Sequence, residues 1–113
     1  MHLRAFGESL GIAFQILDDV LDVVSTEEVL GKKAGTDINE QKPSTVNLLW
    51  LLSSDPLAKS LLFAPTPPDD EIVKQALLHL KKSEIINQAR SLARLYASQA
   101  KESLKSVSSS TPA

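Results

Sequence analysis

Hydrophobic residues recur along most of the chain at the three- and four-residue spacing of α-helices. No stretch alternates between hydrophobic and polar positions as a half-buried strand does. Start and stop signals divide the pattern into predicted helices at about residues 3–24, 45–53, 56–63, 69–82 and 84–106. A polar loop at 31–43 and a proline-rich break at 64–68 separate these segments. The pattern therefore predicts an all-α protein, with a disordered tail at residues 108–113.

Side chains that can cap a helix precede several of these segments. The predicted start signals are Ser44 or Thr45, Asp55 followed by Pro56, Asp69 with Asp70, and Ser83. Within the later helices, the positions expected to be buried share one face or a continuous apolar run. They are Val46, Leu48, Leu49, Trp50 and Leu52; Ile72, Val73, Ala76, Leu77 and Leu80; and Ile85, Ile86, Ala89, Leu92, Ala93, Tyr96, Ala100 and Leu104.

The first predicted helix carries a narrow polar stripe in an otherwise apolar surface. Gln15, Asp18, Asp19 and Asp22 lie at i, i+3, i+4 and i+7, so they share one face, and every other position from Ile12 to Val24 is apolar. A helix that is apolar on most sides is typical of a buried element. Buried carboxylates stay ionised only beside a cation, and oxygen ligands suit Mg²⁺. A solvated acidic stripe, or pairing with Lys and Arg from elsewhere, is the alternative.

The loop that follows contains cations and glycines. Lys32, Lys33 and Lys42 are the nearest dense group of lysines, and Gly31 and Gly35 allow the backbone to approach a ligand closely. Carboxylates followed by such a loop favour a diphosphate bridged to the protein by Mg²⁺. The alternative is an ordinary polar loop whose lysines point into water.

Composition narrows the classes of partner. The chain has 113 residues, 42% hydrophobic residues, a net charge of −2 and no cysteine. This charge gives no general attraction to nucleic acid or to an anionic membrane surface. No apolar run is long enough for a transmembrane segment, and the N-terminus does not fit a signal peptide. Without cysteine there is neither a disulfide framework nor a thiolate metal site.

Several segments together resemble the trans-prenyl (polyprenyl) diphosphate synthases. Phe6-Gly7 and LGIAFQILDDVLD at residues 10–22 are similar to the second Asp-rich region of that family, and LGKKAGTD at 30–37 and KPST at 42–45 are similar to the segment after it. Terpene cyclases also carry an Asp-rich motif, but the GKKAGTD loop points away from them. An EF-hand-like calcium site does not fit, because the acids lie along a helix face.

The resemblance implies a helical bundle that is part of an isoprenoid-synthase fold. It implies metal-binding roles for Asp18, Asp19, Asp22 and Asp37, and diphosphate-binding roles for Gln15, Lys32 and Lys42. Asp18 would be the strongest ligand and Asp22 would act mainly through water. The implied reaction condenses an allylic diphosphate with isopentenyl diphosphate using Mg²⁺. It requires no protein nucleophile, so no catalytic residue is assigned and neither histidine needs a catalytic role; His79 is interpreted as a helix-surface residue.

The sequence also departs from the family pattern. Gln41 replaces the glycine often found before the second lysine, and Ser44 stands where a threonine is usual, with Thr45 displaced by one. The chain contains no first Asp-rich motif and no arginine pair for the second substrate. Residues 1–107 therefore resemble a C-terminal part of a synthase domain, and we expect the isolated chain to be inactive and prone to associate.

A non-catalytic role is the alternative function. A truncated subunit could dimerise with a full-length synthase through its helices and modulate it, and homodimers are equally open. The compartment is open too: relatives of this kind would be cytoplasmic or organellar, in mitochondria or plastids, and this chain carries no targeting signal of its own.

Overall fold

A computed structural model describes residues 2–25 and 34–109, which form six helices and no strand. The helices are α1 (His2–Val24), α3 (Thr36–Asn39), α4 (Thr45–Leu52), α5 (Pro56–Leu62), α6 (Asp70–Lys81) and α7 (Ile85–Ser109). The all-α prediction is confirmed. The sequence also predicts a short turn at 26–30, capped by Thr26, but it lies outside the described residues. So do Gly31, Lys32, Lys33 and the last residues of the predicted tail, 110–113.

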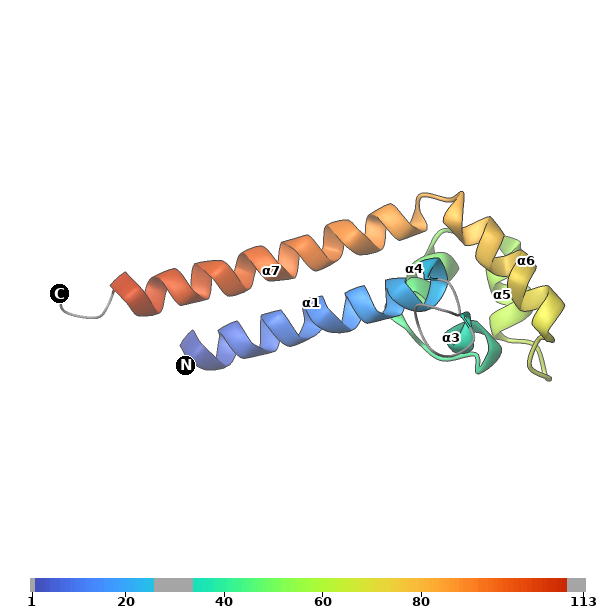
Figure 1. Cartoon of the computed structure of the whole chain (residues 1–113), viewed down its shortest axis with the longest axis horizontal. Coiled ribbons are helices and arrows are strands. Elements are labelled where there is room, and N and C mark those ends of the chain that lie inside the picture. The colour runs from blue at the N-terminus through green and yellow to red at the C-terminus, as the bar shows by residue number, and fades with distance from the viewer. Residues whose placement is uncertain (1, 26–33, 110–113) are drawn as a thin grey trace.

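Two long helices determine the shape of the molecule. Figure 1 shows α1 and α7 lying side by side and antiparallel, while α3, α4, α5 and α6 gather around the C-terminal end of α1. The result is elongated, with extents of 59 × 32 × 24 Å. Among the described helices, none has a stretch both long and apolar enough to cross a bilayer.

The hydrophobic core is concentrated where the short helices meet the long pair. Trp50, Ile38 and Leu80 are completely buried there, together with Val23 and Val46. Outside this core cluster, the buried residues of the pair are small: Ala100 on α7 and Ala13 on α1. Small side chains let two helices approach closely.

Local start signals place the short helices correctly. The side chains of Ser44, Asp55 and Asp69 accept hydrogen bonds from backbone N–H groups in the first turns of α4, α5 and α6. Ser83 Oγ accepts from the Ile85 N–H at 3.3 Å at the start of α7. Helix α7 continues to Ser109, three residues beyond its predicted end.

One helix was missed, and several predicted core positions are exposed. The predicted loop at 31–43 contains α3, a single turn whose Ile38 is fully buried. Leu48, Leu52, Ile72 and Leu104, expected to be buried, are exposed. A single helical turn is too short to show a hydrophobic period, so the sequence pattern cannot reveal it. Burial of one side chain, Ile38, stabilises the turn.

The prediction that α1 is buried on most sides is also wrong for this chain. Ile12, Phe14, Leu17 and Leu21 are exposed, with Phe14 60% accessible. The described helices cover only the side of α1 that faces α7 and the short helices. The apolar residues are where the pattern placed them, but nothing in the described part of the chain covers the second face.

Candidate functional site

A pocket of about 370 Å³ opens where α1, α3 and the start of α4 meet. It is lined by Gln15, Asp19, Asp37, Lys42, Pro43, Ser44 and Thr45. Four of these, Gln15, Asp19, Asp37 and Lys42, are residues that the sequence nominated for a metal or a diphosphate. They come from α1, from α3 and from the turn before α4.

Asp19 fastens the start of α4 to α1. Its carboxylate is buried; Oδ1 accepts a hydrogen bond from Gln15 Nε2 at 3.0 Å, and Oδ2 accepts from the Thr45 N–H at 2.8 Å. The second bond satisfies one of the N–H groups that a helix start leaves without a partner. Both oxygens of Asp19 are therefore already engaged in holding the wall of the pocket.

Asp22 fastens α3 to α1 in the same way. Its Oδ2 accepts from the Asp37 N–H at 3.0 Å, and its backbone oxygen accepts from the Gly35 N–H at 2.8 Å. Asp22 is only 4% exposed, and its Oδ1 finds no hydrogen-bond partner among the described residues. A buried carboxylate oxygen without a partner is costly, so this atom is a candidate for a further ligand.

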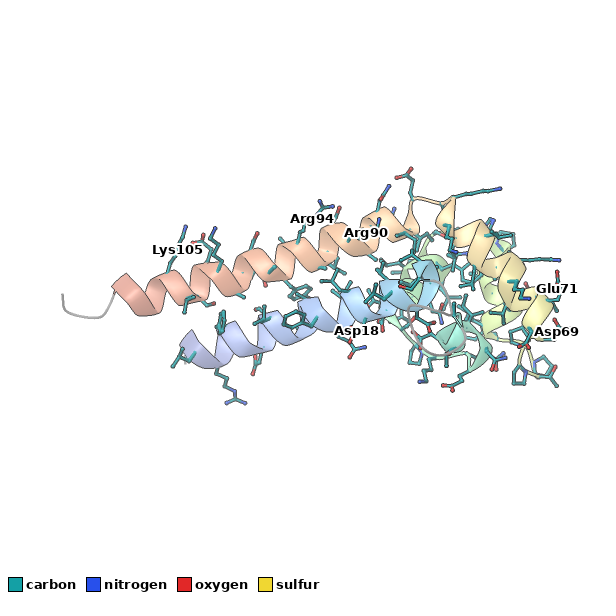
Figure 2. All side chains as sticks on the ribbon, viewed as in Figure 1. Asp18, Asp69, Glu71, Arg90, Arg94 and Lys105 are labelled. Carbon is teal, nitrogen blue, oxygen red and sulfur yellow. The ribbon has the colours of Figure 1, made fainter. Side chains whose placement is uncertain are left out.

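Asp18 lies apart from its neighbours. It is exposed, and Figure 2 shows it projecting from the edge of α1 that faces away from α7. It does not line the pocket that contains Asp19. Of the three aspartates in the predicted polar stripe, Asp19 and Asp22 are thus buried and Asp18 is exposed. Within residues 2–25 and 34–109, no three His, Asp or Glu side chains are grouped closely enough to hold a metal ion.

Lys42 is the nominated lysine that the structure describes. Its Nζ lies 2.9 Å from Glu40 Oε2, and both side chains are about half exposed, at 54% and 48%. The hydrogen bond to Glu40 raises the pKa of Lys42, and the charges of Glu40, Asp37 and Asp22 add to this effect. The ammonium therefore remains protonated at the rim of the pocket.

Gly35 has a different role from the one the sequence suggested. Its φ of 81° is in the left-handed region, and a Cβ at this position would lie 2.5 Å from Val73 Cγ1 on α6. The close approach that requires glycine here is therefore to a helix of the same chain, whereas the sequence suggested a ligand.

Asn47 on α4 was missed by the sequence analysis. Its buried side chain donates from Nδ2 to the backbone oxygens of Asp37, at 3.2 Å, and Lys42, at 2.8 Å. Its own N–H donates to the cap oxygen Ser44 Oγ at 3.1 Å. One signal was available: Asn47 is the single amide in the otherwise apolar run that forms the body of α4.

A second polar cluster lies beyond the C-terminal end of α4. Asp55 Oδ2 accepts from Trp50 Nε1 at 3.0 Å and lies 2.5 Å from His79 Nε2, while its Oδ1 accepts from the Leu57 N–H. Hydrogen bonds from Trp50 and His79 lower the pKa of Asp55. The prediction of His79 as a surface residue holds for its 46% exposure but missed this contact, which joins α6 to the turn before α5.

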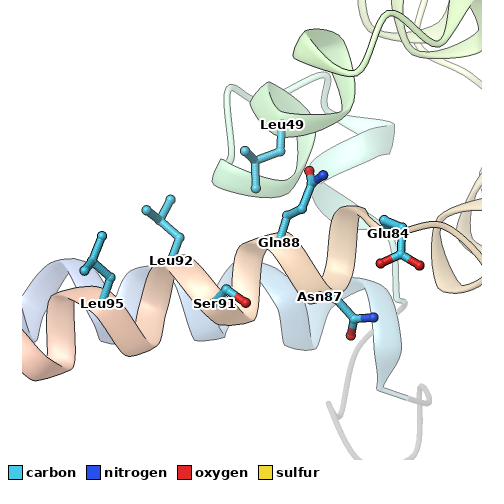
Figure 3. Close-up of a pocket in the computed structure, with 7 residues that line it drawn as sticks. All are labelled: Leu49, Glu84, Asn87, Gln88, Ser91, Leu92 and Leu95. Carbon is cyan, nitrogen blue, oxygen red and sulfur yellow. The ribbon is translucent and has the colours of Figure 1, made fainter.

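A larger pocket of about 550 Å³ lies between α4 and α7 (Figure 3). Its walls combine leucines with polar side chains: Leu49, Glu84, Asn87, Gln88, Ser91, Leu92 and Leu95. None of the residues that the sequence predicted to bind a metal or a diphosphate lines this pocket.

Comparison with known proteins identifies relatives of the chain. The family profile described as "Polyprenyl synthetase" matches residues 1–80. The chain is 35% identical over 111 residues to a "Prenyl transferase" of Synechocystis sp., an alignment that covers 98% of this chain and 34% of the relative. It is 35% identical over 106 residues to the "Nonaprenyl diphosphate synthase" of Mycobacterium tuberculosis, covering 91% and 31%.

A third relative is a subunit by name. The chain is 30% identical over 102 residues to "Heptaprenyl diphosphate synthase component 2" of Bacillus subtilis, covering 90% of this chain and 29% of that protein. The chain thus spans about a third of the length of the curated relatives it matches. No solved structure matches it significantly.

Proposed function

The chain belongs to the polyprenyl synthetase family, and from this membership we propose that it supplies the diphosphate-binding part of a prenyltransferase site. The proposed reaction condenses an allylic diphosphate with isopentenyl diphosphate. The allylic C–O bond breaks and diphosphate departs, a C–C bond forms to isopentenyl diphosphate, and a proton is lost. One observation carries the proposal: Gln15, Asp19, Asp37 and Lys42 line a single pocket.

Two aspartates of α1 that do not line this pocket, Asp18 and Asp22, have the oxygen atoms that Mg²⁺ prefers. Mg²⁺ is usually bound by one or two carboxylates together with substrate phosphates and water, and rarely by an all-protein cage. Asp18 offers an exposed carboxylate, and Asp22 Oδ1 is a buried oxygen with no partner among the described residues. When bound with diphosphate, Mg²⁺ would neutralise phosphate oxygens and stabilise the departing diphosphate.

The chain's own residues would hold and orient the diphosphate. The Lys42 ammonium at the rim provides positive charge for phosphate oxygens. The Gln15 amide, which donates to Asp19, lines the same pocket. Asp19 and Asp22 position this wall through their bonds to Thr45 and Asp37. Lys32, which the resemblance also assigns to the diphosphate, remains part of the proposal, although it lies outside the described residues.

Titration calorimetry with inorganic pyrophosphate tests this proposal directly. We expect the chain to bind pyrophosphate only when Mg²⁺ is present, and Lys42→Ala to weaken that binding. Lys105→Ala is the matched control, because Lys105 is also exposed and also paired with a glutamate, at 3.6 Å from Glu102. Absence of Mg²⁺-dependent binding in the wild-type chain, or equal loss in both variants, would overturn the proposal.

We propose further that the isolated chain binds without turning over. Its 113 residues contain neither a first Asp-rich motif nor an arginine pair for the second substrate. The purified chain should therefore release no prenyl product from an allylic diphosphate, isopentenyl diphosphate and Mg²⁺. Clear product in this assay would show that the chain is sufficient for catalysis.

A second candidate function is favoured by the exposed side of α1. Phe14, Leu17 and Leu21 are exposed in an unbroken part of the helix, and contiguous apolar surface of this kind marks interaction sites. In this role the chain would be a non-catalytic subunit, and the full-length synthase or second copy with which it pairs would cover this face of α1. Co-purification with a complete synthase would support this role. A monodisperse monomer that does not bind the synthase would contradict it.

A further inference from the structure

Asn47 makes direct contact with the backbone of two pocket residues that are five positions apart. Its Nδ2 carries two hydrogens and donates to the backbone oxygens of Asp37 and Lys42, with N···O distances of 3.2 and 2.8 Å. The Lys42 N–H also donates to the Asp37 oxygen, at 2.9 Å. The turn that carries both candidate ligands is thus closed on itself and joined to the inside of α4.

The backbone of Asp37 is hydrogen-bonded at both its N–H and its C=O group. Its N–H donates to Asp22 Oδ2 on α1, and its C=O accepts from Asn47 on α4. Hydrogen bonds are directional, so two of them at opposite ends of one residue fix its position and its orientation. Asn47 is the inner of these two supports, and only 2% of it is exposed.

Burying an amide in this apolar helix is unfavourable unless hydrogen bonds offset the loss of water. Asn47 Oδ1 has no hydrogen-bond partner among the described residues, while both hydrogens of Nδ2 are used on the pocket turn. A side chain selected for packing alone would be apolar here, like its neighbour Val46. The residue type is therefore explained by the turn that Asn47 holds.

We infer that Asn47 is a positioning residue that sets the separation and orientation of Asp37 and Lys42 on the pocket wall. The inference rests on the proposed binding of Mg²⁺-diphosphate at that pocket. It adds a residue that never touches the ligand, because Asn47 does not line the pocket. Removing it leaves both charged side chains present but takes away two of the hydrogen bonds that fix their spacing, and misplaced ligand groups bind an anion poorly.

The test compares Asn47→Ala with Val46→Ala by calorimetry with inorganic pyrophosphate and Mg²⁺. Both residues are buried on α4, so both variants should lose thermal stability. Only Asn47→Ala should weaken binding, by about tenfold, as for other residues that support a ligand shell from behind. Val46→Ala should stay within about twofold of the wild type. Asn47→Ser, which keeps one donor, replaces Asn47→Ala if that variant does not fold.

Amide hydrogen exchange provides the second readout. Exchange at residues 37–42 should accelerate in Asn47→Ala and not in Val46→Ala. Unchanged pyrophosphate binding in Asn47→Ala, or equal losses in both variants, would overturn the inference while leaving the proposed function intact. A wild-type chain that fails to bind pyrophosphate would overturn the proposed function instead. In that case unchanged exchange in Asn47→Ala would also refute the bracing of the turn.

Discussion

The two ends of α1 are held by different kinds of contact. At its C-terminal end, Asp19 and Asp22 accept hydrogen bonds from Thr45 and Asp37, and large side chains such as Trp50 are fully buried nearby. At its N-terminal end, α1 packs along α7 over small residues. In the described part of the chain no side-chain hydrogen bond joins these two helices. We call these regions the pocket end and the paired end.

This difference separates what stabilises the chain from what shapes its site. Apolar contacts are non-directional, so the packing of α1 on α7 fixes the positions of individual polar atoms less strictly than hydrogen bonds do. The pocket end combines a dense core with directional bonds, and it therefore fixes the positions of particular atoms. The candidate ligands lie at this end, where small displacements matter most to binding.

The largest expected effect is on the core of the pocket end. Trp50→Ala removes a fully buried indole and its hydrogen bond to Asp55. It should lower the free energy of unfolding by about 3–5 kcal/mol, as measured by urea denaturation. Phe14→Ala on the exposed face of α1 is the control and should change stability by less than about 0.5 kcal/mol. Equal losses in the two variants would remove the distinction between the buried and the exposed apolar side chains.

The next largest effect is the difference in stability between glycine substitutions at the two ends. Gly35→Ala places a Cβ 2.5 Å from Val73 Cγ1 in a residue with positive φ. The backbone strain is about 1–2 kcal/mol, and overpacking adds about 1–3 kcal/mol. Gly11→Ala in α1 meets no atom within 4 Å. It should stabilise the helix by about 0.5–1 kcal/mol. Thermal unfolding of the two variants should therefore shift in opposite directions, and a shared direction would contradict the packing described for Gly35.

Two neighbouring aspartates separate stability from binding. Asp22→Ala leaves the Asp37 N–H without its partner and should cost about 1–3 kcal/mol of unfolding free energy. Asp18→Asn, at an exposed position, should leave stability unchanged and weaken Mg²⁺-dependent pyrophosphate binding. Urea denaturation and calorimetry on both variants make the comparison. If Asp18→Asn binds as the wild type does, Asp18 is a solvated side chain and its proposed metal role is lost.

The helices could be predicted where their signals are local. Ser44, Asp55 and Asp69 bond N–H groups only two or three residues away, so the sequence alone locates those starts. Helix α3 was not predictable in this way, because it depends on burial of Ile38 and on the bond from the Asp37 N–H to the carboxylate of Asp22, fifteen positions before Asp37. The exposure of Phe14 was equally hidden, since it depends on which helices surround α1.

The candidate site divides along the same line. Residue type and spacing nominated Gln15, Asp19, Asp37 and Lys42, and the structure brings these four to one pocket. Their metal and diphosphate roles stay predictions. Spacing could not show that Asp18 would be exposed while Asp19 and Asp22 are occupied by backbone N–H groups. Nor could it reveal Asn47, whose function depends on a turn that folds back against α4.

The smallest expected effect is a pH dependence at the pocket end. Hydrogen bonds from Trp50 first, and then from His79, lower the pKa of Asp55 in the folded chain. A carboxyl group with a lowered pKa stabilises the fold above its unfolded pKa, about 3.9. That contribution is lost as the pH falls through the folded pKa. His79→Ala removes one of these donors, so the pKa of Asp55 should rise toward its ordinary range.

The wild-type chain should therefore be more stable than His79→Ala by about 0.5–1 kcal/mol near pH 5.5, because the pair is partly exposed. The difference should shrink as the pH falls through the lowered folded pKa of Asp55, where the carboxyl group takes up its proton in both folded chains. Urea denaturation near pH 5.5 and over a series of lower pH values measures it. Glu102→Gln is the paired-end control, since its bond to Lys105 joins two mostly exposed side chains and should contribute nothing measurable at any of these pH values. A pH-independent loss in His79→Ala would mean that His79 acts by packing near the Trp50 ring, 6.2 Å away, and that its bond to Asp55 contributes nothing.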